Sequence, residues 1–341
     1  MIPHNKPSIG PEESQAIAEV IASGWIAKGE KVAQFEQEFA EYVGAKYAIA
    51  VSSGTAALTV ALKVLNINTQ HHRVIIPSYA CAALVNAIRM AGAQHEIKDV
   101  NITDFNLDSI GDLSYDDSDA IIAVHTFGVP VEINTMKTYL PYIIEDCSQA
   151  LGSYINGQHV GLQGDIGIFS FGPSKMITTG SGGMIVTNNK TLADKAREYI
   201  DYDKNVPAFN FAMNDIQAAM GIVQLGKLSG FLDKRFCMAG EYEKICHNKG
   251  WKYQDNNYLQ NYYRFVLIGD FVDRLKQHLA DNGITAIVPI THDELLHNML
   301  GMGIERFPNA EYISTHSLSL PIYPSLTDGE FNHILDCLRR F

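Results

Sequence analysis

The sequence predicts an α/β protein: a large domain with a mostly parallel central sheet covered by helices on both faces, and a smaller α+β domain at the C-terminal end. Two observations lead to this prediction. Between residues 47 and 187, short runs rich in β-branched residues alternate with helical patterns, which is typical of parallel strands joined by crossover helices. Strand and helix patterns are mixed in the last third of the chain, and 341 residues exceed the size of most single cores. We therefore expect two domains, at 1–235 and 236–341.

Two helices are expected ahead of the first strand. The first begins at Pro11, which suits the first turn of a helix, and ends at Gly24. The second covers residues 30–43 and is followed by Gly44, at the usual position of a glycine C-cap. Its apolar residues fall on one helical face. These residues are Val32, Phe35, Phe39, Tyr42 and Val43.

The central sheet is expected to form from the segments that follow these helices. Strand-like and helix-like segments alternate at 47–51, 73–77, 80–92, 94–100, 119–128, 131–140, 142–152, 165–171 and 182–187. A helical stretch over 192–202 and a long helix between 213 and 251 follow, and we expect the long helix to connect the two domains. The C-terminal domain mixes strand and helix patterns at 262–268, 271–284, 314–323 and 327–341.

The composition limits the classes of partner and compartment. Lysine and arginine number 26 against 38 aspartates and glutamates, a net charge of −12 without a basic run, which argues against binding nucleic acid or an anionic membrane. No signal-peptide pattern and no run of about 18 apolar residues occur, so we expect neither export nor a membrane span. The five cysteines are widely spaced without a C-x-x-C pair, which indicates no disulfide framework and no zinc site and favours the cytoplasm.

The first of three segments suited to chemistry is a turn between a strand and a helix. It contains Ser52, Ser53, Gly54 and Thr55. Free backbone N–H groups and the positive end of a helix suit a phosphate at this position, and glycine allows close approach. The alternative is a plain N-cap, because serine and threonine favour that position in any helix.

The second segment ends a strand with Glu145 and Asp146. Ligands bind at the carboxyl edge of the sheet in doubly wound folds, and a buried carboxylate there can hold a proton on a heterocyclic nitrogen. The alternative is a helix cap or a solvated acid in a loop.

The third segment places Lys175 after the strand 165–171, where Gly172 and Pro173 break the chain. Such a turn can project the amine toward the same sheet edge, where desolvation would lower its pKa and make it a nucleophile. A lone lysine is otherwise an exposed, solubilising residue. The order of phosphate-type turn, strand-end acid and turn lysine along one α/β chain favours a function.

Several segments, in the same order, resemble the DegT/DnrJ/StrS family of sugar aminotransferases. These enzymes use pyridoxal phosphate (PLP) and have the aspartate-aminotransferase fold, known as fold type I. The resemblance runs from about Gly24 to Asp328, and its lysine and acid segments are specific. The matching segments are 24–58, 75–93, 144–153, 160–187, 209–225 and 317–330.

The resemblance implies two catalytic residues and a set of cofactor ligands. Lys175 would form the Schiff base with the cofactor aldehyde, and Asp146 would pair with the pyridinium nitrogen. Gln149 would lie near the ring hydroxyl, and Asn210 would reach the phosphate from the neighbouring subunit, which implies a homodimer with shared active sites. The other residues of the implied cofactor site are Gly54, Thr55 and Ser170 at the phosphate, together with Ser53 and Cys81.

The implied reaction moves an amino group from an amino acid, by family habit glutamate, to a keto-sugar. The acceptor would be a nucleotide-linked keto-deoxysugar used for surface polysaccharide or secondary metabolites, and Lys175 would remove the α-proton of the donor. This interpretation has three alternatives. Relatives that dehydrate a deoxysugar carry histidine in place of the lysine, which Lys175 contradicts. A PLP-binding regulatory protein without turnover, or a PLP enzyme acting on a smaller ketone, stays open.

The sequence departs from the family at three places. Cys81 stands where an aromatic residue usually stacks on the cofactor, so Tyr79 is a candidate substitute. Ala212 and Asn214 replace an arginine and a serine or threonine. The Arg-x-His-Gly turn and the loop after it are missing between 196–205 and 207–211, which predicts an altered acceptor pocket. Candidate pocket residues are His125, Tyr202, His292 and His297.

Overall fold

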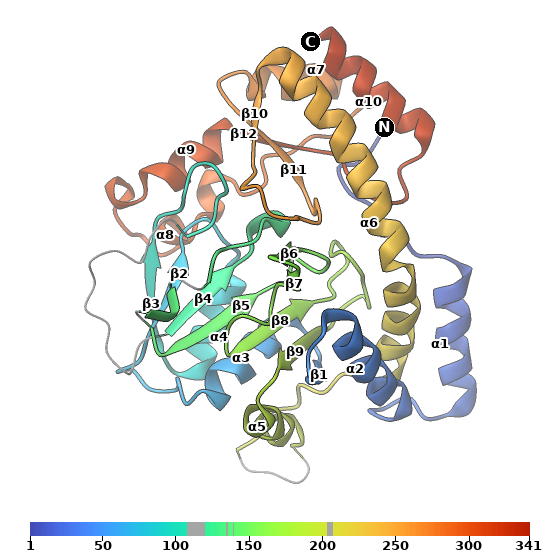
Figure 1. Ribbon diagram of the computed structural model, residues 1–341, viewed down its shortest axis with the longest axis vertical. Coiled ribbons are helices and arrows are strands. Elements are labelled where there is room, and N and C mark those ends of the chain that lie inside the picture. The colour runs from blue at the N-terminus through green and yellow to red at the C-terminus, as the bar shows by residue number, and fades with distance from the viewer. Residues whose placement is uncertain (108–119, 134–135, 139, 203–206) are drawn as a thin grey trace.

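The computed structural model describes residues 1–107, 120–133, 136–138, 140–202 and 207–341. These residues form a large unit around a seven-stranded sheet and a smaller unit around a three-stranded sheet (Figure 1). The long helix α6 (Asp215–Lys249) runs from one unit to the other, and both chain termini lie at the smaller unit. The predicted fold class, a mostly parallel α/β sheet with a smaller C-terminal unit, is confirmed.

The large sheet has the strand order β1-β9-β8-β5-β4-β2-β3. Strands β3, β2, β4, β5 and β8 pair in parallel, as the alternating pattern predicts, whereas β9 is antiparallel to β1 and β8. The connection 171–182 between β8 and β9 contains no helix, and a parallel pair needs a crossover that is usually helical. The strands are β1 (Tyr47–Val51), β2 (Arg73–Pro77), β3 (Gln94–Lys98), β4 (Ala120–Val124), β5 (Tyr142–Asp146), β8 (Ile166–Ser170) and β9 (Gly183–Thr187); β6 (Tyr154–Ile155) and β7 (Gln158–His159) form a separate ribbon.

The first two helices of the large unit begin and end where the sequence predicts, whereas the helices expected at 80–92 and 192–202 cover 83–91 and 190–200. Helix α1 begins at Pro11 and is capped by Gly24, and α2 is capped by Gly44; both glycines have the left-handed φ that glycine adopts readily. The predicted apolar face of α2 is buried in the main core, apart from the half-buried Tyr42. Helix α1 packs along α6 (Figure 1). The helices are α1 (Pro11–Ser23), α2 (Glu30–Val43), α3 (Gly54–Val64), α4 (Ala83–Ala91) and α5 (Lys190–Ile200), with the short turns η1 (Thr126–Gly128) and η2 (Met136–Thr138).

The smaller unit has its own core and an antiparallel sheet of order β10-β11-β12. Ile2 also belongs to this core, because its N–H donates to the Gly283 carbonyl at 2.7 Å and its side chain is buried there. The elements are β10 (Lys252–Tyr253), β11 (Phe265–Ile268), β12 (Ser317–Leu320), α7 (Val272–Asp281), η3 (His292–Glu294), α8 (Leu296–Met299), η4 (Ile304–Arg306), α9 (Pro308–His316) and α10 (Asp328–Arg340).

Helix α6 bears on the predicted domain boundary. It starts with a capping box between Asn214 and Gln217 and ends at Gly250, which has φ +68°. Residue 235 lies inside this continuous helix, so the proposed division into 1–235 and 236–341 would cut one element, and it stays a prediction.

Two further expectations concern single segments. The predicted element at 131–140 contains only the turn η2 among its described residues, because 134, 135 and 139 lie outside them; part of the shortened loop, 203–206, also lies outside. No helix in the described part of the chain combines the length and apolarity needed to cross a bilayer.

Candidate active site

A cavity of about 530 Å³ lies at the carboxyl edge of the large sheet. One wall consists of residues at or just after the ends of strands, which we call the sheet wall: Ser53, Gly54, Thr55, Tyr79, Cys81, Val124, Asp146, Ser148, Gln149, Ser170 and Lys175. The opposite wall comes from the C-terminal part of the chain, and we call it the C-terminal wall: Arg264, Pro289, Ile290, Glu294 and Met299. Strands that run in one direction bring their last residues to one edge, which explains why residues so distant in sequence meet here.

The turn between β1 and α3 meets the end of β8. Ser53 is the N-cap of α3, and its Oγ accepts a hydrogen bond from the Ala56 N–H at 3.1 Å, so the capping interpretation is correct for this side chain. Gly54 leaves room that no other residue would: a Cβ added there would lie 2.9 Å from the Ser170 Cβ. Gly54, Thr55 and Ser170 thus line the cavity together at the positive end of α3, which suits an anion.

Asp146 is the last residue of β5 and is only 8% exposed. One of its carboxylate oxygens accepts the Ser148 N–H at 2.9 Å, and the residue lines the cavity. Adjacent residues of a strand point to opposite faces of the sheet. Asp146 therefore points to the cavity, and Glu145 points away from it.

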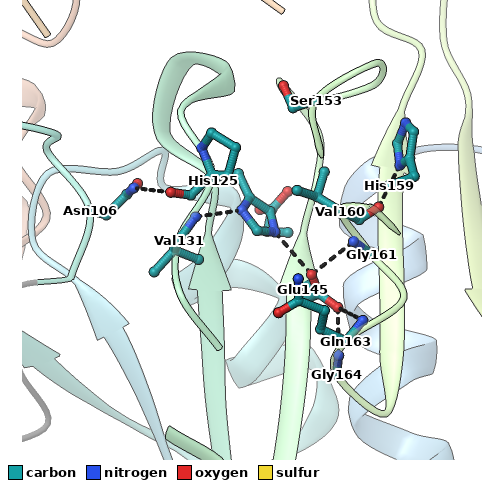
Figure 2. Close-up of polar contacts among 12 residues, drawn as sticks. Asn106, His125, Val131, Glu145, Ser153, His159, Val160, Gly161, Gln163 and Gly164 are labelled. Atoms are coloured by element: carbon teal, nitrogen blue, oxygen red, sulfur yellow. Dashed lines mark hydrogen bonds and ion pairs between the residues drawn. The ribbon is translucent and has the colours of Figure 1, made fainter. Parts of the chain in front are cut away.

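Glu145 binds the loop behind the sheet edge (Figure 2). Its carboxylate accepts hydrogen bonds from the N–H groups of Gly161, Gln163 and Gly164 at 2.5–2.8 Å and from His125 Nε2 at 3.2 Å. Burial alone would raise the pKa of Glu145, but the hydrogen bond and charge of His125 and the bonds from Gly164 and Gly161 lower it. This network fixes the strand that carries Asp146.

The sequence predicts His125 as a residue of the acceptor pocket. The structure places it in this network instead, and it does not line the cavity. It is fully buried, its Nδ1 accepts the Val131 N–H at 3.0 Å, and its Nε2 faces Glu145. Cys147 lies close enough to both side chains for a metal site in principle. Both ring nitrogens already have hydrogen-bond partners, however, and burial, followed by the charges of Glu145 and Asp146, raises the pKa of the Cys147 thiol. The cluster is built as a hydrogen-bond network.

Lys175 lies in the turn after β8, and its backbone N–H donates to the Gly172 carbonyl at 3.1 Å. Its Nζ lies over the Tyr263 ring, 5.7 Å from the centroid, and makes no hydrogen bond or ion pair to any residue described. Burial would raise the pKa of Tyr263, whereas the charges of Lys175 and Arg264 lower it. The amine therefore borders the cavity without a counter-ion.

Three further predicted residues line the sheet wall. Gln149 is held by the Phe127 N–H, which donates to its Oε1 at 2.8 Å. Cys81 is exposed at the cavity. Tyr79 is fully buried and packs edge-on against Phe105 and Phe127, with ring centroids 5.5 and 6.0 Å away.

The remaining predicted residues lie elsewhere. Asn210 is exposed and does not line the cavity; its segment runs beside β1, where the Ser52 N–H bonds the Phe211 carbonyl. Tyr202 is exposed as well. His297 and His292 both bond Glu311, at 2.9 and 2.8 Å, and neither lines the cavity. Three of the four residues weighed for the pocket are thus histidines bound to carboxylates.

Sequence reasoning missed the residues of the C-terminal wall. Arg264 directly precedes the buried strand β11, and a charged residue at the start of an apolar run was the one signal that marked it. Glu294 and Met299 follow no strand and had no signal in the sequence. Phe127 was also missed; it adopts a left-handed φ of +56°, uncommon for a large side chain, and it lines the cavity.

Comparison with known proteins gives consistent results. The sequence profile described as the DegT/DnrJ/EryC1/StrS aminotransferase family matches residues 7–339. A GDP-perosamine synthase of Escherichia coli O157:H7 is 32% identical over 360 residues, covering 100% of this chain and 98% of that protein. The spore coat polysaccharide biosynthesis protein SpsC of Bacillus subtilis is 28% identical, with 99% and 96% covered. An aminotransferase structure from Psychrobacter cryohalolentis superposes with a TM-score of 0.88 at 27% identity, covering 98% of this chain and 97% of that one.

Proposed function

The chain belongs to the DegT/DnrJ/EryC1/StrS aminotransferase family, and from this premise we propose that it transfers an amino group from glutamate to a nucleotide-linked keto-sugar. The observation that carries the proposal is the convergence of Lys175, Asp146 and the anion site around Gly54 in one cavity. The related GDP-perosamine synthase supports a nucleotide-linked sugar as the acceptor, and the spore coat polysaccharide biosynthesis protein supports a role in polysaccharide biosynthesis. We propose a cytoplasmic location, which the five unpaired cysteines support.

Members of this family use pyridoxal phosphate, and the cavity residues fit that group. A phosphate matches the helix end and hydroxyls around Gly54, where a Cβ would collide with Ser170. A free amine and a buried carboxylate complete the set. We propose that Ser53, Gly54, Thr55 and Ser170 hold the phosphate, Asp146 the ring nitrogen, Gln149 the ring hydroxyl side and Lys175 the aldehyde, with Cys81 beside the ring.

When bound, the cofactor supplies a ring that accepts the electron pair released when the α C–H bond of the donor breaks. The Lys175 amine then takes the α-proton as a general base and returns a proton at the acceptor carbon. The Asp146 carboxylate keeps a proton on the ring nitrogen, and the Glu145 network holds the strand that positions it.

We also propose a homodimer with shared sites. Asn210 is exposed away from the cavity of its own chain, as a residue serving the partner would be. A second hollow of about 580 Å³ lies near Trp25, whose side chain is 82% exposed beside the exposed Ile21 and Ile26. Exposed apolar groups of this kind mark association surfaces.

Mixing two inactive variants tests the shared site. Lys175→Ala and Asn210→Ala proteins, refolded together, should recover about a quarter of wild-type activity, because half of the dimers are mixed and each has one intact site. No recovery on mixing, with a dimer present by ultracentrifugation, would contradict sharing.

The function itself is tested by incubating purified protein with PLP, glutamate and a panel of keto-sugar nucleotides. An aminated sugar nucleotide detected by mass supports the proposal. Cofactor binding without conversion by any of the common amino acids would point to the regulatory alternative, and product from a free ketone alone to the smaller-substrate alternative.

A further inference from the structure

Arg264 presents a positive charge to the cavity from the C-terminal wall. The side chain is half-buried, its Nε is buried without a hydrogen-bond partner, and no carboxylate among the described residues lies within ion-pair distance. A cation withdrawn from water is costly unless an anion pairs with it. The guanidinium therefore has no described carboxylate to pair with on the side that faces the cavity.

Arg264 has a neutral neighbour on its other side. Its Nη1 is 3.3 Å from His4 Nε2, which is also 2.8 Å from the Ser319 Oγ. Burial, and then the charges of Arg264 and Arg235, lower the pKa of His4 to about 3, so the imidazole is uncharged at neutral pH. His4 orients the guanidinium without neutralising it.

The acid in the C-terminal wall is already bonded. Glu294 lines the cavity, but its Oε2 accepts hydrogen bonds from the Thr291 N–H at 2.9 Å and from the Thr291 hydroxyl at 2.8 Å. These two hydrogen bonds lower the pKa of Glu294 more than the charge of Arg264 does. The carboxylate serves the turn η3 and does not pair with Arg264.

Arg235 provides a contrast within the same unit. It is fully buried, and its Nη1 donates to the carbonyls of Tyr262, Tyr263 and Ile322 at 2.8–3.2 Å. Its Nε is also unpartnered, so an unpaired Nε alone does not indicate a ligand site. The difference is that Arg264 lines the central cavity whereas Arg235 does not.

Aromatic rings fix Arg264 close to the reacting amine. The guanidinium carbon lies 5.3 Å from the Phe127 ring centroid and 5.6 Å from that of Tyr263. The Lys175 Nζ lies 5.7 Å from the centroid of the same Tyr263 ring, so the two charged groups are at most about 11 Å apart, the sum of the two centroid distances. Both groups also line the same cavity, so an anion bound by Arg264 shares that cavity with the amine that removes the proton.

We propose that Arg264 binds the α-carboxylate of the amino-acid donor; this rests on the proposed function. The planar guanidinium matches a carboxylate through two parallel hydrogen bonds. The α-carboxylate is one bond from the carbon that loses its proton to Lys175, which suits two cations that contact one ring and line one cavity. The diphosphate of a sugar nucleotide is separated from the keto carbon by several bonds, so it fits this place less well.

Binding of glutarate, an unreactive dicarboxylate, tests the proposal without turnover. Calorimetry on the PLP-loaded protein should give a dissociation constant about 10- to 100-fold higher for Arg264→Gln than for wild type. Arg274→Gln, on the exposed face of α7, is the control and should bind as wild type does. Equal binding by Arg264→Gln and wild type would overturn the proposal.

Single-turnover kinetics identify which substrate carries the anion. Wild type should react about 10- to 100-fold faster with L-glutamate than with its α-amide at limiting concentration, and Arg264→Gln should lose this discrimination. The rate of the second half-reaction, with the keto-sugar nucleotide, should be the same in Arg264→Gln as in wild type. If Arg264→Gln lowers only the rate with the keto-sugar nucleotide or only the affinity for a nucleoside diphosphate, the assignment is overturned.

Misfolding of the variant and failure of the proposed function can each be told apart from failure of the Arg264 assignment. If Arg264→Gln does not fold by circular dichroism, Arg264→Lys keeps the charge and should show an intermediate loss of discrimination; wild type that does not discriminate at all contradicts the proposal without any variant. If wild type aminates no sugar, the proposed function fails, while the glutarate measurement still decides the role of Arg264.

Discussion

The two walls of the cavity are held in different ways. The sheet wall is anchored by main-chain elements: Asp146 and Ser170 end strands, and Ser53 caps a helix. The C-terminal wall depends on side-chain contacts, such as those of Arg264 with His4 and of Glu294 with Thr291. Groups anchored by strands suit a cofactor that stays in one place. Groups held by single side chains can be replaced without disturbing the sheet, which suits the binding of different substrates. We therefore expect substitutions in the sheet wall to affect the cofactor or the stability of the fold, and substitutions in the C-terminal wall to affect the binding of substrates.

Lys175→Ala should have the largest effect. Lys175 is the one lysine that lines the cavity among the described residues, and removing this base and nucleophile should lower turnover by about 10³- to 10⁴-fold. PLP should still bind, because the anion site around Gly54 is intact. Product formation and equilibrium dialysis of PLP measure the two quantities, and the exposed Lys276→Ala is the control. Substantial transamination by the variant would remove Lys175 from the proposed mechanism.

Glu145→Gln should weaken the support of the sheet wall by about 3 kcal/mol of unfolding free energy, because a buried acceptor of four hydrogen bonds loses its charge. The folded pKa of Glu145 lies below its unfolded value, so its contribution is present above the unfolded pKa and is lost as pH falls through the folded pKa. Urea unfolding at pH 7 and in acid should therefore show a wild-type decline with acid that is smaller in the variant. Parallel pH profiles would contradict this role.

Gly54→Ala tests the close approach in the anion site. The added Cβ would lie 2.9 Å from the Ser170 Cβ, and overpacking of this kind should lower PLP affinity by roughly 10-fold. Gly230→Ala is the matched control, because a Cβ there meets no atom within 4 Å. A titration of PLP monitored by absorbance compares them. Unaltered PLP affinity in Gly54→Ala would place the phosphate elsewhere.

Thr291→Ala should have the smallest effect and should separate the two walls. Loss of the capping box beside the cavity frees the Glu294 carboxylate to compete for Arg264, which should raise the KM for glutamate by up to about 5-fold and leave PLP affinity unchanged. Thr327→Ala removes the same kind of capping box from α10, away from the cavity, and should change stability alone. A change in PLP affinity in Thr291→Ala would show that the walls are not independent.

Much of the sheet wall could be predicted because local pattern and fold class together fix it. The turn at Gly54 and the lysine Lys175 follow strands, and the acid Asp146 ends one, and each of these strands has a clear pattern in the sequence. Parallel strands bring such residues to one edge whatever the loops do. Helix ends at Gly24 and Gly44 were equally readable, because glycine at a C-cap is a local signal.

The histidines show where local pattern stops being informative. The sequence predicts His125, His292 and His297 as candidate pocket residues, yet His125 bonds Glu145, and His292 and His297 bond Glu311. Hydrogen-bond partners of this kind depend on which side chains packing brings together, and composition does not reveal them. The antiparallel direction of β9 was missed for a related reason, since it follows from the lack of a crossover helix.

The sequence by itself determined the order of strand, turn and helix, the residues of the sheet wall and the family to which the chain belongs. Periodicity and capping depend on residues that are close together in the chain, so the sequence alone reveals them. The tertiary structure alone decided that Arg264 faces the cavity beside His4, a residue 260 positions away. It also decided that Glu145 and Asp146, adjacent in the chain, serve different sides of the strand. Charge pairing and burial arise between distant segments, and they exist only once the chain has folded.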